Sequence, residues 1–221
     1  SEIKKACEYM KKNQRPYAFC VRASTFGDYK LSNVETSSYS MTRESAIEGI
    51  LSLLNPQDVV VSTTGKASRE LYETRVRNEQ TDRADFLTVG AMGHCSQIAL
   101  GVALQQPNKK VFCIDGDGAA LMHMGGLVTI AQQAPTNFVH IMINNGAHES
   151  VGGQSSGAFN VDWPNLALAC GYKNGLQVSS LDSLKEAVAK AKSVKETFFI
   201  EVRTSLGSRK DLGRPKSTPL E

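Results

Sequence analysis

The sequence predicts an α/β fold with three layers, in which helices cover both faces of a mainly parallel β-sheet. From residue 57 onward, apolar β-branched segments alternate with segments of helical periodicity, which is the pattern of βαβ units. Residues 111–114 and 138–143 are almost continuously hydrophobic, as parallel strands are when helices cover both of their faces. Most of the chain is therefore expected to form one large α/β domain.

The expected elements follow from the hydrophobic periodicity along the chain, with apolar β-branched runs read as strands and helical spacings read as helices. We expect helices at residues 2–12, 43–54, 67–76, 94–105, 121–133 and 183–193. We expect strands at residues 17–22, 58–62, 110–115, 137–144, 176–179 and 197–204. The last helix has Leu184, Val188 and Ala191 on one face and lysines opposite, which predicts an amphipathic surface helix.

The first 40 residues differ from the rest of the chain. A helix and a strand are followed there by a polar passage at residues 24–40 that is rich in Gly, Ser and Thr. One helix and one strand cannot bury a core by themselves. We therefore expect residues 1–40 to be the last helix and strand of a preceding domain plus a linker, residues 41–205 to form the α/β domain, and residues 206–221 to be a basic tail.

Composition excludes several classes of protein. Lys and Arg total 25 and Asp and Glu total 22, so the net charge of +3 does not predict a nucleic-acid partner. The sequence has no run of about 18 apolar residues and no apolar signal core at its start, so we expect no membrane partner and a cytoplasmic location. The five cysteines include no Cys-x-x-Cys pair, so neither a disulfide framework nor a zinc site is predicted.

Residues that suit phosphate and metal binding follow two predicted strands. The strand at 110–115 runs into Gly116-Asp117-Gly118-Ala119 and then a helix. Glycines allow the backbone to approach a phosphate, and a helix N-terminus offers free N–H groups. The Asp117 carboxylate is a hard oxygen ligand that suits Mg²⁺.

The strand at 137–144 leads into Asn144-Asn145-Gly146-Ala147, which offers amide and carbonyl oxygens to the same metal ion. Twenty-five residues separate Gly118 from Asn144, enough for one helix and one strand. A right-handed crossover of that length places both segments side by side at one edge of the sheet. A dinucleotide fingerprint is disfavoured because Leu121 stands where its third glycine is required, and the sequence has no P-loop motif.

This Gly-Asp-Gly, spacer and Asn-Asn arrangement resembles the diphosphate-binding motif of the thiamine-diphosphate-dependent enzymes. The resemblance implies the fold of their cofactor-binding domains and the cofactors thiamine diphosphate and Mg²⁺. It implies that Gly116, Asp117, Gly118, Ala119 and Asn145 bind the cofactor. The implied metal ligands are Asp117, the Asn145 side chain and the Ala147 carbonyl.

Two further segments are expected to contact the cofactor. In this superfamily the segment at 88–94 places an apolar wedge, here Met92, under the cofactor and a carbonyl, here that of Gly90, against its amino group. The alternative for Met92 is an ordinary core methionine. Thr63, Thr64 and Gly65 could add hydroxyl and amide groups to the diphosphate, or could form a plain loop that caps a helix.

Within the superfamily the chain is similar to the phosphonopyruvate decarboxylases, through residues 61–71, 89–99, 116–124, 144–154, 207–209 and 211–215. The resemblance implies decarboxylation of phosphonopyruvate, a small 2-oxo acid, to phosphonoacetaldehyde. It also implies that residues 1–40 end a pyrimidine-binding domain that is otherwise missing. The glutamate that activates the cofactor would belong to that domain, so we expect the isolated chain to be inactive. Because the cofactor lies between subunits in this superfamily, a homo-oligomer is expected.

Candidate residues for proton transfer and for substrate binding lie near these segments. His148 and His94 are candidates for proton transfer, and the alternative for each is a loop histidine that satisfies backbone groups. A phosphonate and a carboxylate need cationic partners. The candidates are Lys66, Arg69, Arg209 and Arg214, and the alternative is a solvated basic surface.

Three other functions remain open at this point. A sulfopyruvate decarboxylase subunit would need similar cations for its sulfonate. Acetohydroxyacid synthase-like carboligation matches only the cofactor motif. A noncatalytic binding or assembly module could retain the same motif for structural reasons.

Overall fold

The computed structural model describes residues 1–27, 38–81 and 84–215, which divide into two compact units at residues 1–34 and 35–221. The first unit contains α1 (Glu2–Asn13), whose N-cap Ser1 accepts a hydrogen bond from the Lys4 backbone. The strand expected at residues 17–22 is wrong, because this segment forms no strand. A strand needs a paired neighbour, and the described part of this unit contains none. The expected linker at 24–40 lies partly outside the described residues.

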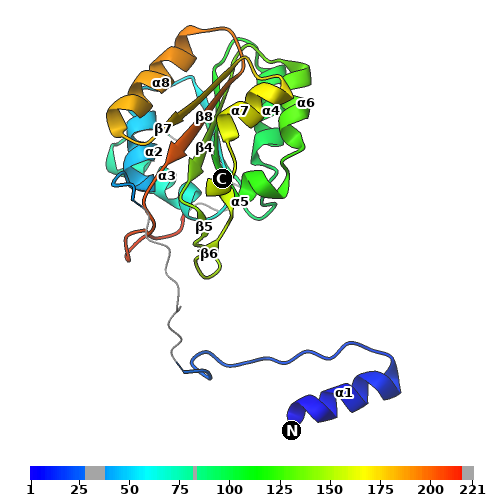
Figure 1. Ribbon diagram of the computed structural model, residues 1–221. Coiled ribbons are helices and arrows are strands. Elements are labelled where there is room, and N and C mark those ends of the chain that lie inside the picture. Colours follow the sequence, from blue (N-terminus) through cyan, green and yellow to red (C-terminus); the bar gives the residue numbers. More distant parts are fainter. Residues whose placement is uncertain (28–37, 82–83, 216–221) are drawn as a thin grey trace. The chain divides into compact units, whose positions relative to one another are not determined.

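The second unit is built on six parallel strands (Figure 1), which run in the spatial order β2-β1-β3-β4-β8-β7. Their bounds are β1 (Val59–Ser62), β2 (Asp85–Leu87), β3 (Val111–Gly116), β4 (Phe138–Asn144), β7 (Asn174–Val178) and β8 (Phe198–Arg203). The central strands β3 and β4 are buried along almost their whole length. The predicted mainly parallel sheet is therefore confirmed.

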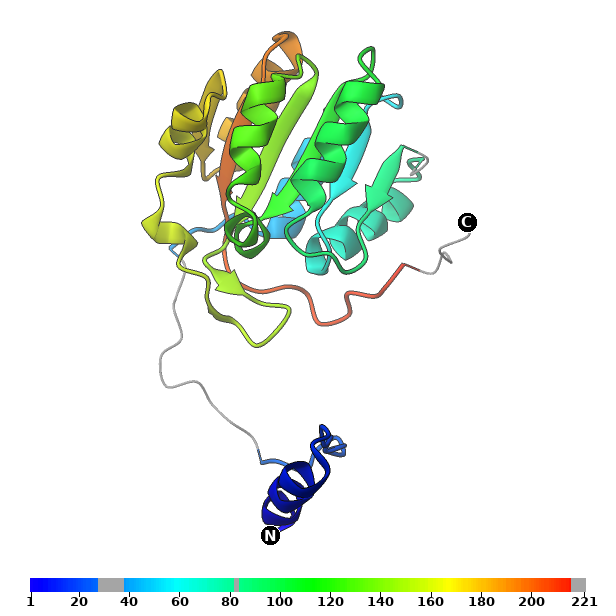
Figure 2. The same ribbon diagram turned by 90° about the vertical axis from the view of Figure 1, so that its right-hand side faces the viewer.

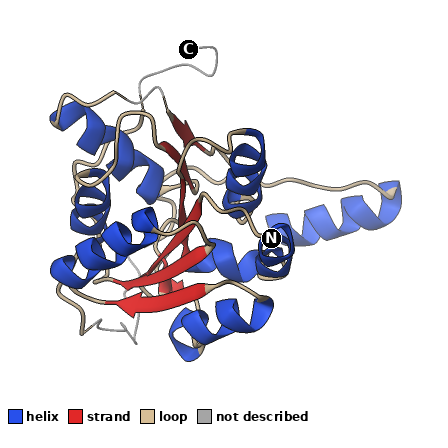
Figure 3. Cartoon of the chain, turned by 90° about the horizontal axis from the view of Figure 1, so that it is seen from above, coloured by secondary structure: helices blue, strands red, loops and turns tan. Residues whose placement is uncertain are grey.

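Helices cover both faces of this sheet, as the views in Figures 2 and 3 show. One face packs against α2 (Arg43–Leu51), α3 (Lys66–Arg77) and α8 (Leu181–Ser193). The other face packs against α4 (Cys95–Gln105), α6 (Gly126–Gln133) and α7 (Trp163–Cys170). Each face has its own buried apolar cluster, so the predicted three-layer architecture is also confirmed.

The helix expected at residues 121–133 is wrong as a single element. The structure has α5 (Asp117–Met122) followed by α6, and Gly125 and Gly126 lie at the junction. Glycine is a poor helix former, which explains the break between α5 and α6. Helix α5 begins at Asp117, four residues before the expected start at residue 121.

Several short elements were not predicted. They are β2, the antiparallel pair β5 (Ala147–His148) and β6 (Gln154–Ser155), the 3₁₀ turn η1 (Ala158–Asn160), and α7. Strand β2 has three residues and the hairpin strands have two each, which is too short for periodicity to be recognised. Within the described part of the chain, no helix has the length and apolar character needed to cross a bilayer.

The parallel topology determines where the site lies. Residues 63–65 follow β1, residues 88–94 follow β2, Asp117 follows β3 and residues 145–148 follow β4. The carboxyl ends of parallel strands share one edge of the sheet, which is where ligands bind in open α/β folds. Segments that are far apart in the sequence therefore meet at this edge.

Candidate functional site

A cavity of about 590 Å³ opens at the carboxyl edge of the sheet. Its volume lies within the range of small-molecule sites. Most residues expected to bind a cofactor, metal or substrate line it: Thr63, Thr64, Gly65, Lys66, Met92, Gly116, Asp117, Gly118, Ala119, Asn145, Ala147 and His148. The predicted meeting of these loops is therefore what the structure shows, while their roles remain predictions.

Asp117 is the buried acid of this cavity. It occupies the first turn of α5 and is only 6% exposed. The Ser156 hydroxyl donates a 2.5 Å hydrogen bond to its Oδ2. Burial raises the pKa of Asp117 above its usual value, although bonds from Ser156 and the Gly118 N–H and the nearby charge of His148 act in the opposite direction. The carboxylate is thus in a site that a cation would stabilise.

We call the start of α5 at Asp117 and Gly118, together with the turn after β4 at residues 145–148, the corner. Gly118 allows His148 and Met92 to approach the start of α5. A Cβ atom at residue 118 would lie 2.6 Å from Nδ1 of His148 and 3.3 Å from the terminal carbon of Met92. A side chain at residue 118 would force the His148 ring to shift, so glycine is what permits this close packing. His148 consequently lies against the first turn of α5 and faces the cavity together with Asp117.

The turn after β4 presents oxygens from two residues. The Asn145 Oδ1 accepts the Ala147 N–H at 3.1 Å, and the Ala147 carbonyl accepts the Glu149 N–H at 3.0 Å. An amide or carbonyl oxygen has two lone pairs, so each can still bind a ligand. With the Asp117 carboxylate, these atoms form an all-oxygen donor set, which fits Mg²⁺.

The loops after β1 and β2 meet at another wall of the cavity. The Gly90 N–H donates to the Thr64 hydroxyl at 3.3 Å, which connects the two loops, although Gly90 is not itself among the lining residues. Gly65 is the N-cap of α3 with φ of 102° and provides no side-chain cap to that helix. The first N–H groups of α3 are therefore free to meet an anion.

Five of the predicted site residues do not line the cavity: Gly90, His94, Arg69, Arg209 and Arg214. The exposed His94 ring packs edge-on against His123, with 4.2 Å between ring centroids. Arg209 forms ion pairs with Glu44, Glu73 and Asp211. The predicted roles of these residues in proton transfer, substrate binding and cofactor binding stay predictions.

Arg43 is a lining residue that the sequence did not reveal. Its guanidinium donates to both carboxylate oxygens of Glu70, at 2.6 and 2.8 Å, and to Glu149 at 2.7 Å. Glu149 also accepts the Gly207 N–H. Burial acts to raise the pKa of Glu149, but the bonds from Arg43 and Gly207 and the charges of Arg43 and Lys66 outweigh it and lower the pKa.

Hydrogen bonds and ion pairs fasten the chain segment after β8, at residues 206–215, to the rest of the unit, and Figure 2 shows the course of this segment. We call this segment the strap. It is held by Glu149 through Gly207, and by Glu73 through Arg209 and through the Gly213 N–H at 2.8 Å. The strap therefore joins α2 and α3 to the loop that carries His148. The remaining tail residues, 216–221, lie outside the described part.

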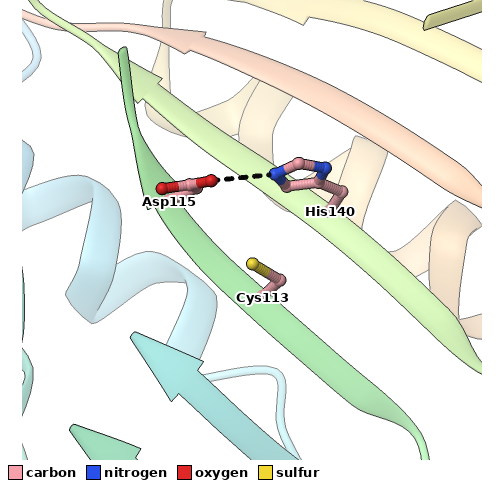
Figure 4. A group of neighbouring side chains, drawn as sticks. All are labelled: Cys113, Asp115 and His140. Carbon is pink, nitrogen blue, oxygen red and sulfur yellow. Dashed lines mark hydrogen bonds and ion pairs between the residues drawn. The ribbon is translucent and has the colours of Figure 1, made fainter. Parts of the chain in front are cut away.

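A buried polar network lies beneath the corner (Figure 4). Asp115 faces His140 at 3.4 Å, and the other ring nitrogen of His140 contacts the Tyr172 hydroxyl at 3.1 Å. Asp115 also accepts the Gly116 N–H at 2.9 Å. Cys113 lies near enough for a shared metal ion, but burial raises the pKa of its thiol well above the usual value. Hydrogen bonds account for the polar atoms of Asp115 and His140, so the network supports the turn without an ion.

Comparisons with known proteins agree with this geometry. Residues 63–202 match the family model described as "Thiamine pyrophosphate enzyme, C-terminal TPP binding domain". The chain is 45% identical over 180 residues to the phosphonopyruvate decarboxylase of Streptomyces hygroscopicus, covering 81% of this chain and 43% of that protein. It is 36% identical over 132 residues to the sulfopyruvate decarboxylase subunit beta of Methanothermobacter thermautotrophicus, covering 60% of this chain and 68% of that subunit.

A solved structure shares the fold. It is described as a putative thiamin diphosphate-dependent enzyme from Mycobacterium smegmatis, with a TM-score of 0.63 and 20% identity, and the match covers 80% of this chain and 35% of that one. The chain spans less than half the length of the phosphonopyruvate decarboxylases that it matches.

Proposed function

The chain belongs to the thiamine pyrophosphate enzymes, as a C-terminal cofactor-binding domain, and from this premise we propose that it forms the diphosphate-binding part of a decarboxylase for phosphonopyruvate. The observation that carries the proposal is the oxygen donor set of Asp117, Asn145 and Ala147 beside the cavity. The 45% identity to a phosphonopyruvate decarboxylase supports the choice of substrate.

Each part of the cavity has a task in this proposal. Asp117, the Asn145 amide and the Ala147 carbonyl would hold Mg²⁺, and the N–H groups at the start of α5 would meet the diphosphate. Thiamine diphosphate supplies the electron sink that makes loss of CO₂ from a 2-oxo acid possible. Met92 provides an apolar surface beneath the cofactor, and the absence of a side chain at Gly118 leaves room for the Met92 side chain.

His148 and Lys66 are the chain's own groups nearest to the chemistry. His148 lines the cavity beside Asp117, so its imidazole is placed to hold or deliver a proton. Lys66 lines the same cavity at the first position of α3. Its ammonium group, together with the free N–H groups of that helix, suits an anionic substrate group.

The proposal includes partners that complete the site. A pyrimidine-binding domain would supply the glutamate that activates the cofactor, because no residue of this chain matches it. That domain would come from a second subunit of a homo-oligomer. Two large apolar side chains near Met92 are exposed. Val89 is close to Met92 in sequence, and Met122 lies in the same cavity wall. Their exposure supports a surface that the second domain would cover.

The test is to measure formation of CO₂ and phosphonoacetaldehyde with and without a pyrimidine-binding domain. We expect the 221-residue chain alone to be inactive and the complemented assembly to turn over phosphonopyruvate. Thiamine diphosphate with Mg²⁺ should raise the melting temperature of the assembly. Turnover by the isolated chain would contradict the assignment of the glutamate, and binding without turnover would indicate a noncatalytic module.

Sulfopyruvate is a second candidate substrate. The chain matches 68% of a protein that is named as the beta subunit of sulfopyruvate decarboxylase, and a sulfonate needs cations similar to those for a phosphonate. Competition between the two substrates in the complemented assembly separates the candidates. A higher kcat/KM for sulfopyruvate would replace the first assignment with the second.

A further inference from the structure

Glu201 is a buried carboxylate that the cofactor-binding scheme does not use. It lies in β8, the neighbour of β4, and is 0% exposed. Its Oε1 accepts the Asn144 side-chain amide and the Arg203 Nε–H, each at 2.7 Å. Its Oε2 has no hydrogen-bond partner among the described residues. Burial raises the pKa of Glu201, so this carboxyl group is costly to the fold and requires an explanation.

The bond to Glu201 orients the side chain of Asn144. With its amide nitrogen directed to Glu201, Asn144 presents Oδ1 to the Gly146 N–H at 3.0 Å. Gly146 lies between Asn145 and Ala147, whose oxygens form part of the proposed metal site. Asn144 is itself 0% exposed, and its amide nitrogen also lies 3.5 Å from the Ala158 carbonyl, so this side chain is held in one orientation away from water.

The same turn is fixed from its other side by an aromatic ring. Gly146 has φ of 74°, and a Cβ there would lie 2.5 Å from the ring of Phe159. The guanidinium of Arg203 lies 4.8 Å from the centroid of that ring. Arg203 therefore contacts both the ring and Glu201, so β8 supports the turn through two routes.

We propose that Glu201 is the positioning residue of the metal-binding turn: through Asn144 it fixes the Gly146 N–H and so the placement of the Asn145 and Ala147 oxygens. The inference rests on the proposed function for its consequence in metal binding, but the hydrogen-bond chain itself does not. Glu201 is a positioning residue because it touches neither metal nor cofactor in this scheme. Partners in the outer shell of a metal site commonly change affinity by about 10 to 100-fold when removed.

Three variants of the full 221-residue chain test the proposal. Glu201→Ala removes the acceptor, whereas Glu201→Gln keeps an acceptor oxygen of the same reach. Asn137→Ala is the matched control, because Asn137 is a buried asparagine just before β4, and its amide donates to three backbone carbonyls far from the turn. Melting temperatures without ligand measure the structural loss in each variant.

The first readout is hydrogen exchange of the Gly146 amide by NMR, without any ligand. We expect Glu201→Ala to accelerate it at least about tenfold relative to the wild type, and Glu201→Gln and Asn137→Ala to stay within about threefold. Should Glu201→Ala fail to fold, Asn144→Ala interrupts the same series of hydrogen bonds at its second residue. We expect this variant also to accelerate exchange of the Gly146 amide. Unchanged Gly146 exchange in the folded variant overturns the proposal.

The second readout is Mn²⁺ binding in the presence of thiamine diphosphate, followed by the electron paramagnetic signal of free Mn²⁺. We expect about 10 to 100-fold weaker binding in Glu201→Ala and near-normal binding in Glu201→Gln. Equal weakening in Asn137→Ala would show a general structural effect and overturn the proposal. If the wild-type chain complemented with a pyrimidine-binding domain also binds no Mn²⁺, the proposed function fails, while Gly146 exchange still decides whether Glu201 positions the turn.

Discussion

Two groups of charged side chains lie at the carboxyl edge of the sheet and use their charges in opposite ways. At the corner of the cavity, Asp117 is buried beside a neutral hydroxyl and faces open space. Behind it, Arg43 is enclosed by Glu70 and Glu149, and Arg209 by other carboxylates. Among the described residues Asp117 forms no ion pair, whereas the charges around the strap are paired within the chain.

The pKa directions reflect this difference. Burial raises the pKa of Asp117, and the bonds from Ser156 and the Gly118 N–H and the charge of His148 offset that effect only in part. Burial alone would raise the pKa of Glu149 too, but Arg43 and the Gly207 N–H reverse the direction. A carboxylate without an ion-pair partner among the described residues is available to a cation, whereas a carboxylate in a buried ion pair stabilises the fold. Charge and proximity to a site are therefore insufficient to assign a binding role.

Asp117→Asn should give the largest change in ligand binding. We expect affinity for Mg²⁺ and thiamine diphosphate to fall at least about 100-fold, since a charged oxygen ligand is lost. The unliganded chain should melt at the same or a higher temperature, because removal of a poorly solvated charge relieves the fold. Titration calorimetry and thermal melts measure the two effects on the complemented assembly.

Asp162→Asn is the matched control for this change. Asp162 is an exposed N-cap of α7 that does not line the cavity, and asparagine caps helices equally well. We expect its ligand affinity to equal that of the wild type. A loss of unliganded stability in Asp117→Asn with retained affinity would show that the corner is structural and would break the comparison.

The sequence predicts which residues meet at the corner, but it does not predict which residues pair around the strap. Gly116, Asp117 and Asn145 are adjacent to long buried strands, and parallel topology brings the ends of such strands together whatever the details of packing. The pairing of Arg43 with Glu149 joins residues 106 positions apart. No periodicity encodes that contact, because it depends on where a loop and a helix terminus meet after the core has formed.

The same distinction explains the other differences between prediction and structure. Long apolar strands were recognised, whereas the three residues of β2 carry too little pattern, although β2 is what carries the 88–94 loop to Thr64. The charge of Arg209 and the resemblance of its segment to the family predict a role in substrate binding. Its carboxylate partners lie on α2 and α3, and only the folded chain reveals them.

Glu149→Ala should produce the largest loss of stability. Arg43 would remain buried with Glu70 as its only carboxylate, and the strap would lose its anchor at Gly207. We expect the free energy of unfolding to fall by about 2 kcal/mol, measured by urea denaturation. The control Glu48→Ala removes an exposed pair with Arg77 and should stay within about 0.5 kcal/mol of the wild type. Equal effects would contradict a structural role for the buried pair.

The pH dependence of stability should reveal the buried ion pair of Glu149 with Arg43. Because the pKa of Glu149 is lower in the folded chain than in the unfolded chain, its ionised form stabilises the fold above the unfolded value. That stabilisation is lost as the pH falls through the folded pKa. We expect the wild type to lose stability more steeply than Glu149→Gln below about pH 4.5, the ordinary value for this group. Parallel curves from urea denaturation at each pH would reject the assignment.

Gly118→Ala tests the packing at the corner and should have a smaller effect. The new Cβ would lie 2.6 Å from His148 and 3.3 Å from Met92, so the His148 ring must move. We expect a loss of about 1 kcal/mol in stability and a changed NMR shift of the His148 ring. Gly101→Ala is the control, since that helical glycine has open space, and it should be neutral or stabilising. An unmoved His148 ring would show that the corner has more room than described.

Arg209→Gln should have the smallest effect and sharpens the comparison most directly. Arg209 is about 30% exposed and shares Glu44 with Arg77, so the loss in stability should be below about 1 kcal/mol. If the strap uses this charge internally, KM for the 2-oxo acid in the complemented assembly will stay within about twofold of the wild type. Arg77→Gln removes the other partner of Glu44 and serves as the control. A tenfold higher KM in Arg209→Gln alone would show that Arg209 leaves its carboxylates to reach the substrate, and the paired and unpaired groups would then belong to one site.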